Sequence, residues 1–64
     1  MKLIDFLKVV DNDTFIFVSI AVCGMQFETR HSAEFYITNG DDLNKRKIEQ
    51  IYTDDEGLHV RLEN

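Results

Sequence analysis

Apolar residues at the start of the chain follow the spacing of a helix. Leu3, Phe6, Leu7 and Val10 stand at i, i+3, i+4 and i+7, along one stripe of an amphipathic helix. The acidic run DNDT at 11–14 comes next, and Asp and Asn side chains favour local backbone hydrogen bonds over a continued helix. The sequence therefore predicts an N-terminal helix that ends at an acidic turn.

The segment from Thr14 to Cys23, TFIFVSIAVC, is almost wholly apolar. Its β-branched and aromatic residues favour a strand. Period two assigns one face to Ile16, Val18, Ile20 and Val22, and the other to Phe15, Phe17, Ser19 and Ala21. Because both faces are largely apolar, we expect either a central strand covered on both sides or a strand whose second face meets another chain.

The residues after Gly24 alternate between apolar and polar positions up to residue 37. The alternation predicts a strand that pairs antiparallel with 14–23 and has one solvated face. The face assigned to the core comprises Phe27, Thr29, His31, Ala33, Phe35 and Ile37. The solvated face comprises Gln26, Glu28, Arg30, Ser32, Glu34 and Tyr36.

Two turns divide the C-terminal half. Asn39-Gly40 marks a break, after which Asp41 or Asp42 can cap a short helical turn. The segment 46–63 then predicts a hairpin with its loop at 53–57 and with Leu58, Val60 and Leu62 on one face of the closing strand. Residues 47–52 fit a strand, and a helical stripe begun at Leu43 is the alternative.

These segments predict a single α+β domain over residues 1–64. An N-terminal helix is followed by a four-stranded, mostly antiparallel sheet, with a sheet curled into a small barrel as the alternative. One helix covers one face of such a sheet. We expect it to cover the Ile16 face together with Phe27 and Phe35, which leaves Phe15 and Phe17 uncovered within the monomer.

The composition points to a marginally stable cytoplasmic protein. A domain of 64 residues buries only about 60% of the surface of its unfolded chain. The single cysteine, Cys23, allows no internal disulfide and favours a reducing compartment. The run 14–23 is shorter than the roughly 20 apolar residues of a membrane-spanning helix.

No set of residues predicts an active site, a cofactor site or a metal site. On a strand, Glu28 and His31 point to opposite faces, and the same holds for His31 and Ser32. We expect His31 to be a core histidine, His59 to be a solvated residue of the outer face, and Cys23 to be a small buried thiol. The acidic turns lack the spaced ligands of a calcium loop, so we expect a protein that is not an enzyme.

Charged residues suggest two binding surfaces. Twelve acidic residues against seven basic ones give a net charge of −5, which disfavours contact with a phosphate backbone. If the two C-terminal turns lie at one end of the sheet, they form an acidic rim for a basic protein partner. Its members are Asp41, Asp42, Glu49, Asp54, Asp55 and Glu56. The cationic cluster Lys45, Arg46 and Lys47 suggests nucleic-acid binding instead.

Two stretches of the chain resemble a known type of protein. LIDFLKVVDNDTFIFV at 3–18 and RKIEQIYTDDEGLHVRLE at 46–63 are similar to segments of short acidic proteins carried by prophages and conjugative elements of Gram-positive bacteria. Such proteins include inhibitors of host defence, among them anti-CRISPR proteins. The resemblance implies a stoichiometric inhibitor of a host defence nuclease or another nucleic-acid enzyme.

Three functions thus follow from the sequence. The first is a binding protein that uses the acidic rim and an apolar patch against a nucleic-acid-binding enzyme. The second is a self-assembling module that dimerises through the strand at 14–23, with Phe15 and Phe17 at the contact. The third is direct binding of nucleic acid through Lys45, Arg46 and Lys47.

Overall fold

The computed structural model describes residues 1–64 and contains three helices and four strands. In chain order these are α1 (Leu3–Leu7), β1 (Phe15–Val22), β2 (Met25–Ser32), α2 (Ala33–Asn39), α3 (Asp41–Asn44), β3 (Ile48–Asp54) and β4 (Gly57–Leu62). The predicted α+β class, with an N-terminal helix and a four-stranded sheet, is confirmed. None of the helices has the length and apolar character needed to cross a bilayer.

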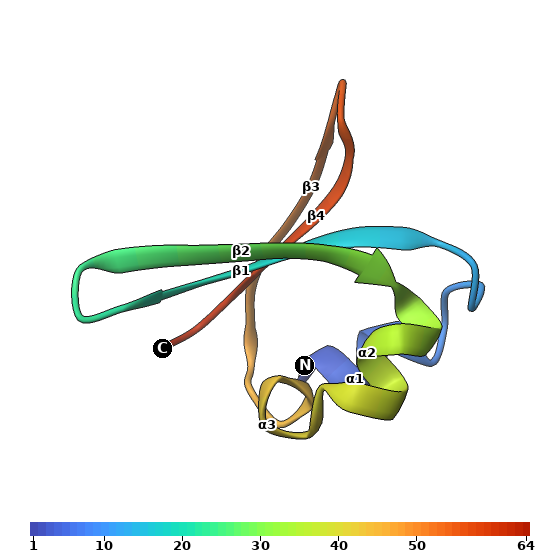
Figure 1. Ribbon diagram of the computed structural model, residues 1–64, viewed down its shortest axis with the longest axis horizontal. Helices are drawn as coiled ribbons and strands as arrows, with labels where there is room; N and C mark the ends of the chain where they lie inside the picture. The colour runs from blue at the N-terminus through green and yellow to red at the C-terminus, as the bar shows by residue number, and fades with distance from the viewer.

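The strands form one open, mixed sheet in the order β2-β1-β4-β3 (Figure 1). β1 runs antiparallel to β2, β3 runs antiparallel to β4, and β1 and β4 pair in parallel at the centre of the sheet. The sheet is therefore not closed into a barrel, and β2 and β3 are its two edges. Because β1 has a neighbour on each side, its backbone is not free to pair with a second copy.

The helices lie on one side of the sheet, and the core forms between them and that face (Figure 1). α1 buries Leu3 and Leu7 of the predicted stripe, and the other two members, Phe6 and Val10, pack against the core. The sheet supplies the predicted aliphatic positions of β1 and β4. The buried apolar residues are Leu3, Leu7, Ile16, Val18, Ile20, Ala33, Tyr36, Val60 and Leu62.

Helix α2 replaces the last part of the strand predicted to reach residue 37. Ser32 caps α2, because its Oγ accepts a hydrogen bond from the backbone N–H of Phe35 at 3.2 Å. Tyr36 is buried, and its hydroxyl donates to the carbonyl oxygen of Ile16 at 3.2 Å and lies 2.9 Å from Thr29 Oγ1. Burial raises the pKa of this phenol. The prediction placed Tyr36 on the solvated face and was wrong there.

The core face predicted for the second strand is also wrong in part. Phe27 is 52% exposed and Phe35 is 42% exposed. The end of the β1–β2 hairpin projects beyond the helices (Figure 1). Phe27 belongs to this end of β2, two residues after the strand begins at Met25. Val22 lies at the same end and is only half-buried. His31 does face the helix side, but it is half-buried and stacks on Phe35 with ring centroids 3.8 Å apart.

The C-terminal half follows the predicted hairpin. Residues 48–54 form strand β3, which settles the alternative between strand and helix for 47–52. The loop is tighter than predicted, because Asp54 already pairs with Gly57 across the turn. A short helix, α3, follows the break at Gly40, and Gly40 itself is its N-cap in place of Asp41 or Asp42.

Candidate interaction surface

The face of the sheet that the helices leave open carries a row of four side chains, one from each strand. The register places Arg30 opposite Phe17, Phe17 opposite His59, and His59 opposite Tyr52. We call these four residues the aromatic row. Phe17 and Tyr52 stack on the two faces of His59, each with ring centroids 4.7 Å apart. The Cζ atom of Arg30 lies 5.5 Å from the centre of the Phe17 ring and 4.7 Å from that of Phe15.

The rings of the aromatic row stand upright on the sheet. Their planes differ by 11° between Phe17 and His59 and by 2° between Tyr52 and His59. The centroid spacing matches the separation of neighbouring strands, about 4.7–4.9 Å. The rings therefore cover one another's faces and turn their edges to solvent, and only the outer face of Tyr52, on the edge strand β3, has no ring or guanidinium group against it. Such a surface suits apolar side chains better than nucleobases, which stack on open ring faces.

One carboxylate, that of Asp54, bonds to His59, and a second lies near its other ring nitrogen, which makes no hydrogen bond. Its Nε2 lies 2.8 Å from Asp54 Oδ1, and its Nδ1 lies 3.9 Å from Glu28 Oε2. With only 7% of its surface exposed, His59 is not the solvated residue that the sequence predicted. The parallel pairing of β1 and β4 is the cause, because it brings Phe17 alongside His59.

Asp54 connects the aromatic row to the β3–β4 turn. Its Oδ1 also accepts hydrogen bonds from the backbone N–H groups of Glu56 at 2.8 Å and Gly57 at 3.2 Å. These bonds, led by the one from His59, hold the pKa of the Asp54 carboxyl below its ordinary value. The turn and the row are therefore one hydrogen-bonded unit.

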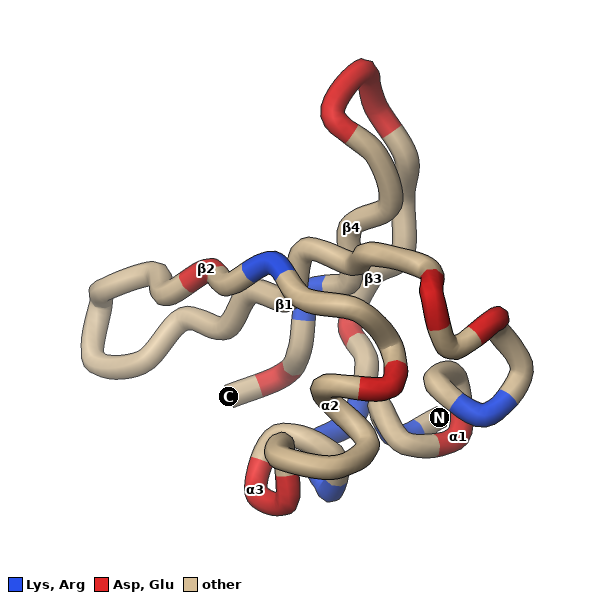
Figure 2. Tube along the Cα trace, turned by 45° about the vertical axis from the view of Figure 1, so that its right-hand side comes forward, with Lys and Arg blue, Asp and Glu red and all other residues tan.

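The six predicted rim acids do not form one rim. Asp54, Asp55 and Glu56 lie at the tip of the β3–β4 hairpin, whereas Asp41 and Asp42 lie in α3 at the opposite end of the molecule (Figure 2). Glu49 lies in β3, away from both groups. The condition on which a single rim depended is thus not met. Of these acids, only those of the β3–β4 turn, which we call the acidic turn (Asp54–Glu56), adjoin the aromatic row.

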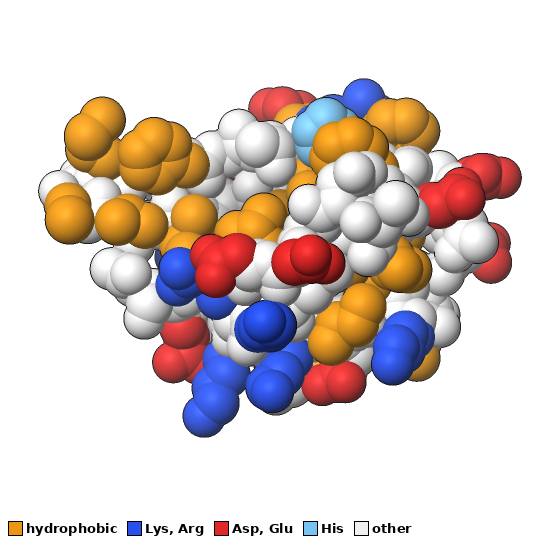
Figure 3. Space-filling model, turned by 60° about the horizontal axis from the view of Figure 1, so that its bottom comes forward, with side chains coloured by type: hydrophobic (Ala, Val, Ile, Leu, Met, Phe, Trp, Pro, Cys, Tyr) orange, Lys and Arg blue, Asp and Glu red, His pale blue; other side chains and the backbone are white.

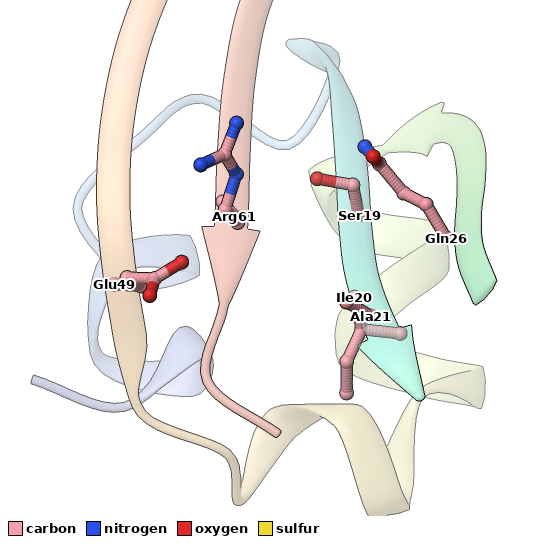
Figure 4. Close-up of a pocket in the computed structure, with 6 residues that line it drawn as sticks. All are labelled: Ser19, Ile20, Ala21, Gln26, Glu49 and Arg61. Carbon is pink, nitrogen blue, oxygen red and sulfur yellow. The ribbon is translucent and has the colours of Figure 1, made fainter. Parts of the chain in front are cut away.

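A shallow hollow of about 250 Å³ lies further along the open face (Figure 4). The small side chains of Ser19 and Ala21 lie at β1, and Gln26, Glu49 and Arg61 stand around them. Neither Arg61 nor Arg30 forms a salt bridge. The open face therefore combines ring edges with two unpaired guanidinium groups.

The remaining candidates lie elsewhere. Cys23 is exposed in the β1–β2 turn, so the prediction of a buried thiol is wrong. Phe15, predicted to lack cover, is 51% exposed, while Phe17 is half-buried within the aromatic row. On the helix side, Arg46 pairs with Asp42 at 3.3 Å, and Lys2 lies beside Lys47. Several Lys and Arg side chains gather on the face of the molecule seen in Figure 3.

Sequence reasoning missed the aromatic row because its members come from all four strands. Arg30 was assigned to a solvated face and Tyr52 to an uncertain segment, and no local pattern links either to His59. The one local signal was TDDEG at 53–57, where an Asp begins a tight turn that contains Gly. Comparisons with known protein families, curated proteins and solved structures gave no match for this chain.

Proposed function

We propose that this protein is a small cytoplasmic binding protein that contacts the basic surface of a protein partner. The open face of the sheet supplies the apolar part of the contact, and the acidic turn supplies the charge. The observation that carries the proposal is the bond between Asp54 and His59, which fixes the acidic turn against the aromatic row. A protein partner is favoured because the row presents ring edges.

The partner class that fits is a nucleic-acid-binding enzyme. Carboxylates on a projecting turn can occupy a channel that normally holds phosphates, and complementary potential raises the association rate and the specificity. The resemblance to proteins of mobile elements supports the same class, with stoichiometric inhibition of a defence nuclease as its concrete form. No catalytic step by this chain is part of the proposal.

The test compares two double charge reversals that change the net charge equally. The tagged protein is used to isolate a partner from a Gram-positive host lysate, and the purified partner is then titrated at several salt concentrations. Asp55→Lys with Glu56→Lys alters the acidic turn but spares Asp54. Asp41→Lys with Asp42→Lys is the matched control at the far end, where the Arg46–Asp42 pair is exposed and contributes little.

We expect the reversal in the acidic turn to weaken binding at least about tenfold at low salt, mainly by slowing association. The control should stay within a few-fold of wild type. Phe15→Ser should weaken binding at every salt concentration, because it removes apolar contact. Equal losses for both double reversals would mean that net charge alone matters and would overturn the proposal.

Nucleic-acid binding through Lys45, Arg46 and Lys47 is the second candidate. The position of Lys2 beside Lys47 enlarges that cluster on the helix side, away from the open face. A labelled single-stranded oligonucleotide separates the two candidates. Binding that falls steeply with salt and is lost in Lys45→Gln with Lys47→Gln would favour the second.

A further inference from the structure

The two edge strands of the sheet differ in how well they can accept another strand. β3 has a bulge between Ile48 and Gln50, which interrupts the regular edge. Its charged residues are all acidic, so they would repel those of a second copy. All residues of β2 pair in register with β1 without a bulge. β2 carries one acid, Glu28, and one base, Arg30, two positions apart. β2 is therefore the unguarded edge.

The hairpin turn determines which backbone groups of β2 point outward. Cys23 and Gly24 both have positive φ, 53° and 80°, which is typical of a two-residue type I′ turn. In such a turn the flanking pair, Val22 and Met25, is hydrogen-bonded. Hydrogen-bonded and non-hydrogen-bonded pairs alternate along antiparallel strands. The backbone N–H and C=O groups that point away from β1 are therefore those of Gln26, Glu28, Arg30 and Ser32.

We infer that two copies of this chain pair through β2, antiparallel and about a two-fold axis at Thr29. This register places Glu28 opposite the partner's Arg30, and the symmetry repeats the pair. Both residues belong to the outward-pointing set, so the same register satisfies their backbone groups. In the two neighbouring registers that also pair outward-pointing residues, Glu28 would face the partner's Glu28 or Arg30 would face the partner's Arg30. Like charges in direct opposition destabilise the pairing.

The side chains of the two paired β2 strands also match on the helix side of the sheet. The register brings Phe27 opposite the partner's His31, at a non-hydrogen-bonded pair where side chains approach most closely. Within each chain His31 stacks on Phe35, which is itself exposed. The pairing therefore gives Phe27 an aromatic partner, although the helices of its own chain leave it in water. Charge matches on one face of the sheet and aromatic surface matches on the other.

The first test is a charge swap followed by sedimentation over a range of concentrations. Glu28→Arg alone or Arg30→Glu alone makes like charges meet twice per dimer, and we expect the dissociation constant of the dimer to rise at least about tenfold. An equimolar mixture of the two variants should restore dimers, because each copy then offers the charge that the other lacks. Glu49→Arg on the β3 edge is the matched control and should dimerise like wild type.

The second test locates the two-fold axis with single cysteines in a Cys23→Ser background. Thr29 faces the partner's Thr29 with Cα atoms about 4.5 Å apart in a non-hydrogen-bonded pair. Thr29→Cys should therefore form a disulfide-linked dimer under mild oxidation. Glu28→Cys and Arg30→Cys should not, because strand geometry separates each from its symmetry mate by roughly 8–9 Å.

Three results would overturn the inference. The first is a wild-type protein that sediments as a monomer up to high micromolar concentration. The second is a mixture of the two charge variants that stays as monomeric as each variant alone. The third is faster cross-linking at position 28 or 30 than at position 29, which would place the axis elsewhere.

Discussion

The two faces of the sheet are stabilised in different ways. The helix side is aliphatic and sealed, and residues such as Ile16 and Val60 lose almost all contact with water there. The open side contains no sealed layer, and its side chains are ordered by stacking on one another and by the bonds of Asp54. The comparison teaches that apolar burial supports the fold on one side, while ring stacking together with the bonds of Asp54 orders the aromatic residues on the other.

The comparison is tested most strongly by truncating one apolar side chain on each side. Leu7→Ala removes a fully buried side chain and should lower the free energy of unfolding by about 2–5 kcal/mol, a large fraction of the stability of so small a domain. Phe15→Ala on the open side should cost less than about 1 kcal/mol. Urea denaturation followed by circular dichroism measures both values. Similar losses would contradict the contrast between the faces.

A smaller effect is expected at the centre of the aromatic row. His59→Ala removes both ring stacks and the partner of Asp54, and should cost roughly 2–3 kcal/mol. His59→Phe keeps the stacks and loses only the hydrogen bond, so it should recover most of that loss. A His59→Phe protein no more stable than His59→Ala would show that the hydrogen bond, and not stacking, holds the row together.

The smallest effect is the acid dependence of Asp54. Because its pKa in the folded protein lies below the ordinary value of 3.8, Asp54 stabilises the fold above that pH. This contribution disappears as the pH falls from 3.8 through the lowered pKa. The difference in unfolding free energy between wild type and Asp54→Asn should therefore shrink on acidification. Asp55→Asn, at a carboxylate that makes no hydrogen bond, is the control for the loss of one acidic charge from the same turn.

The sequence predicted burial correctly where the pattern within a single strand determines it. The alternation of β1 marked Ile16, Val18 and Ile20 as buried. Its doubly apolar character left two alternatives, a central strand and a strand whose second face meets another chain, and the structure places it at the centre of the sheet. The helix at 33–39 was missed because its residues also fit period two. Ser32 before it and Gly40 after it are helix-end signals that could have revealed it.

The candidate surface could not be predicted because it depends on pairing between remote strands. The position of His59 in sequence gives an outer-face residue, as expected. Its burial follows from the parallel register with β1, which no local pattern encodes. The prediction of a single acidic rim was wrong for the same reason. The topology of the chain, and no local pattern, places α3 and the β3–β4 turn at opposite ends of the molecule.

The parallel pairing of β1 with β4 also has a consequence for how the chain folds. Each hairpin joins strands that are neighbours in sequence, but Ile16 meets Leu58 only after the whole intervening chain has been arranged. Contacts of such long separation carry most of the loop-closure entropy and slow the folding of a domain. During synthesis, the central seam of the sheet therefore cannot close until β4 has left the ribosome, and until then the backbone groups of β1 that pair with β4 have no partner.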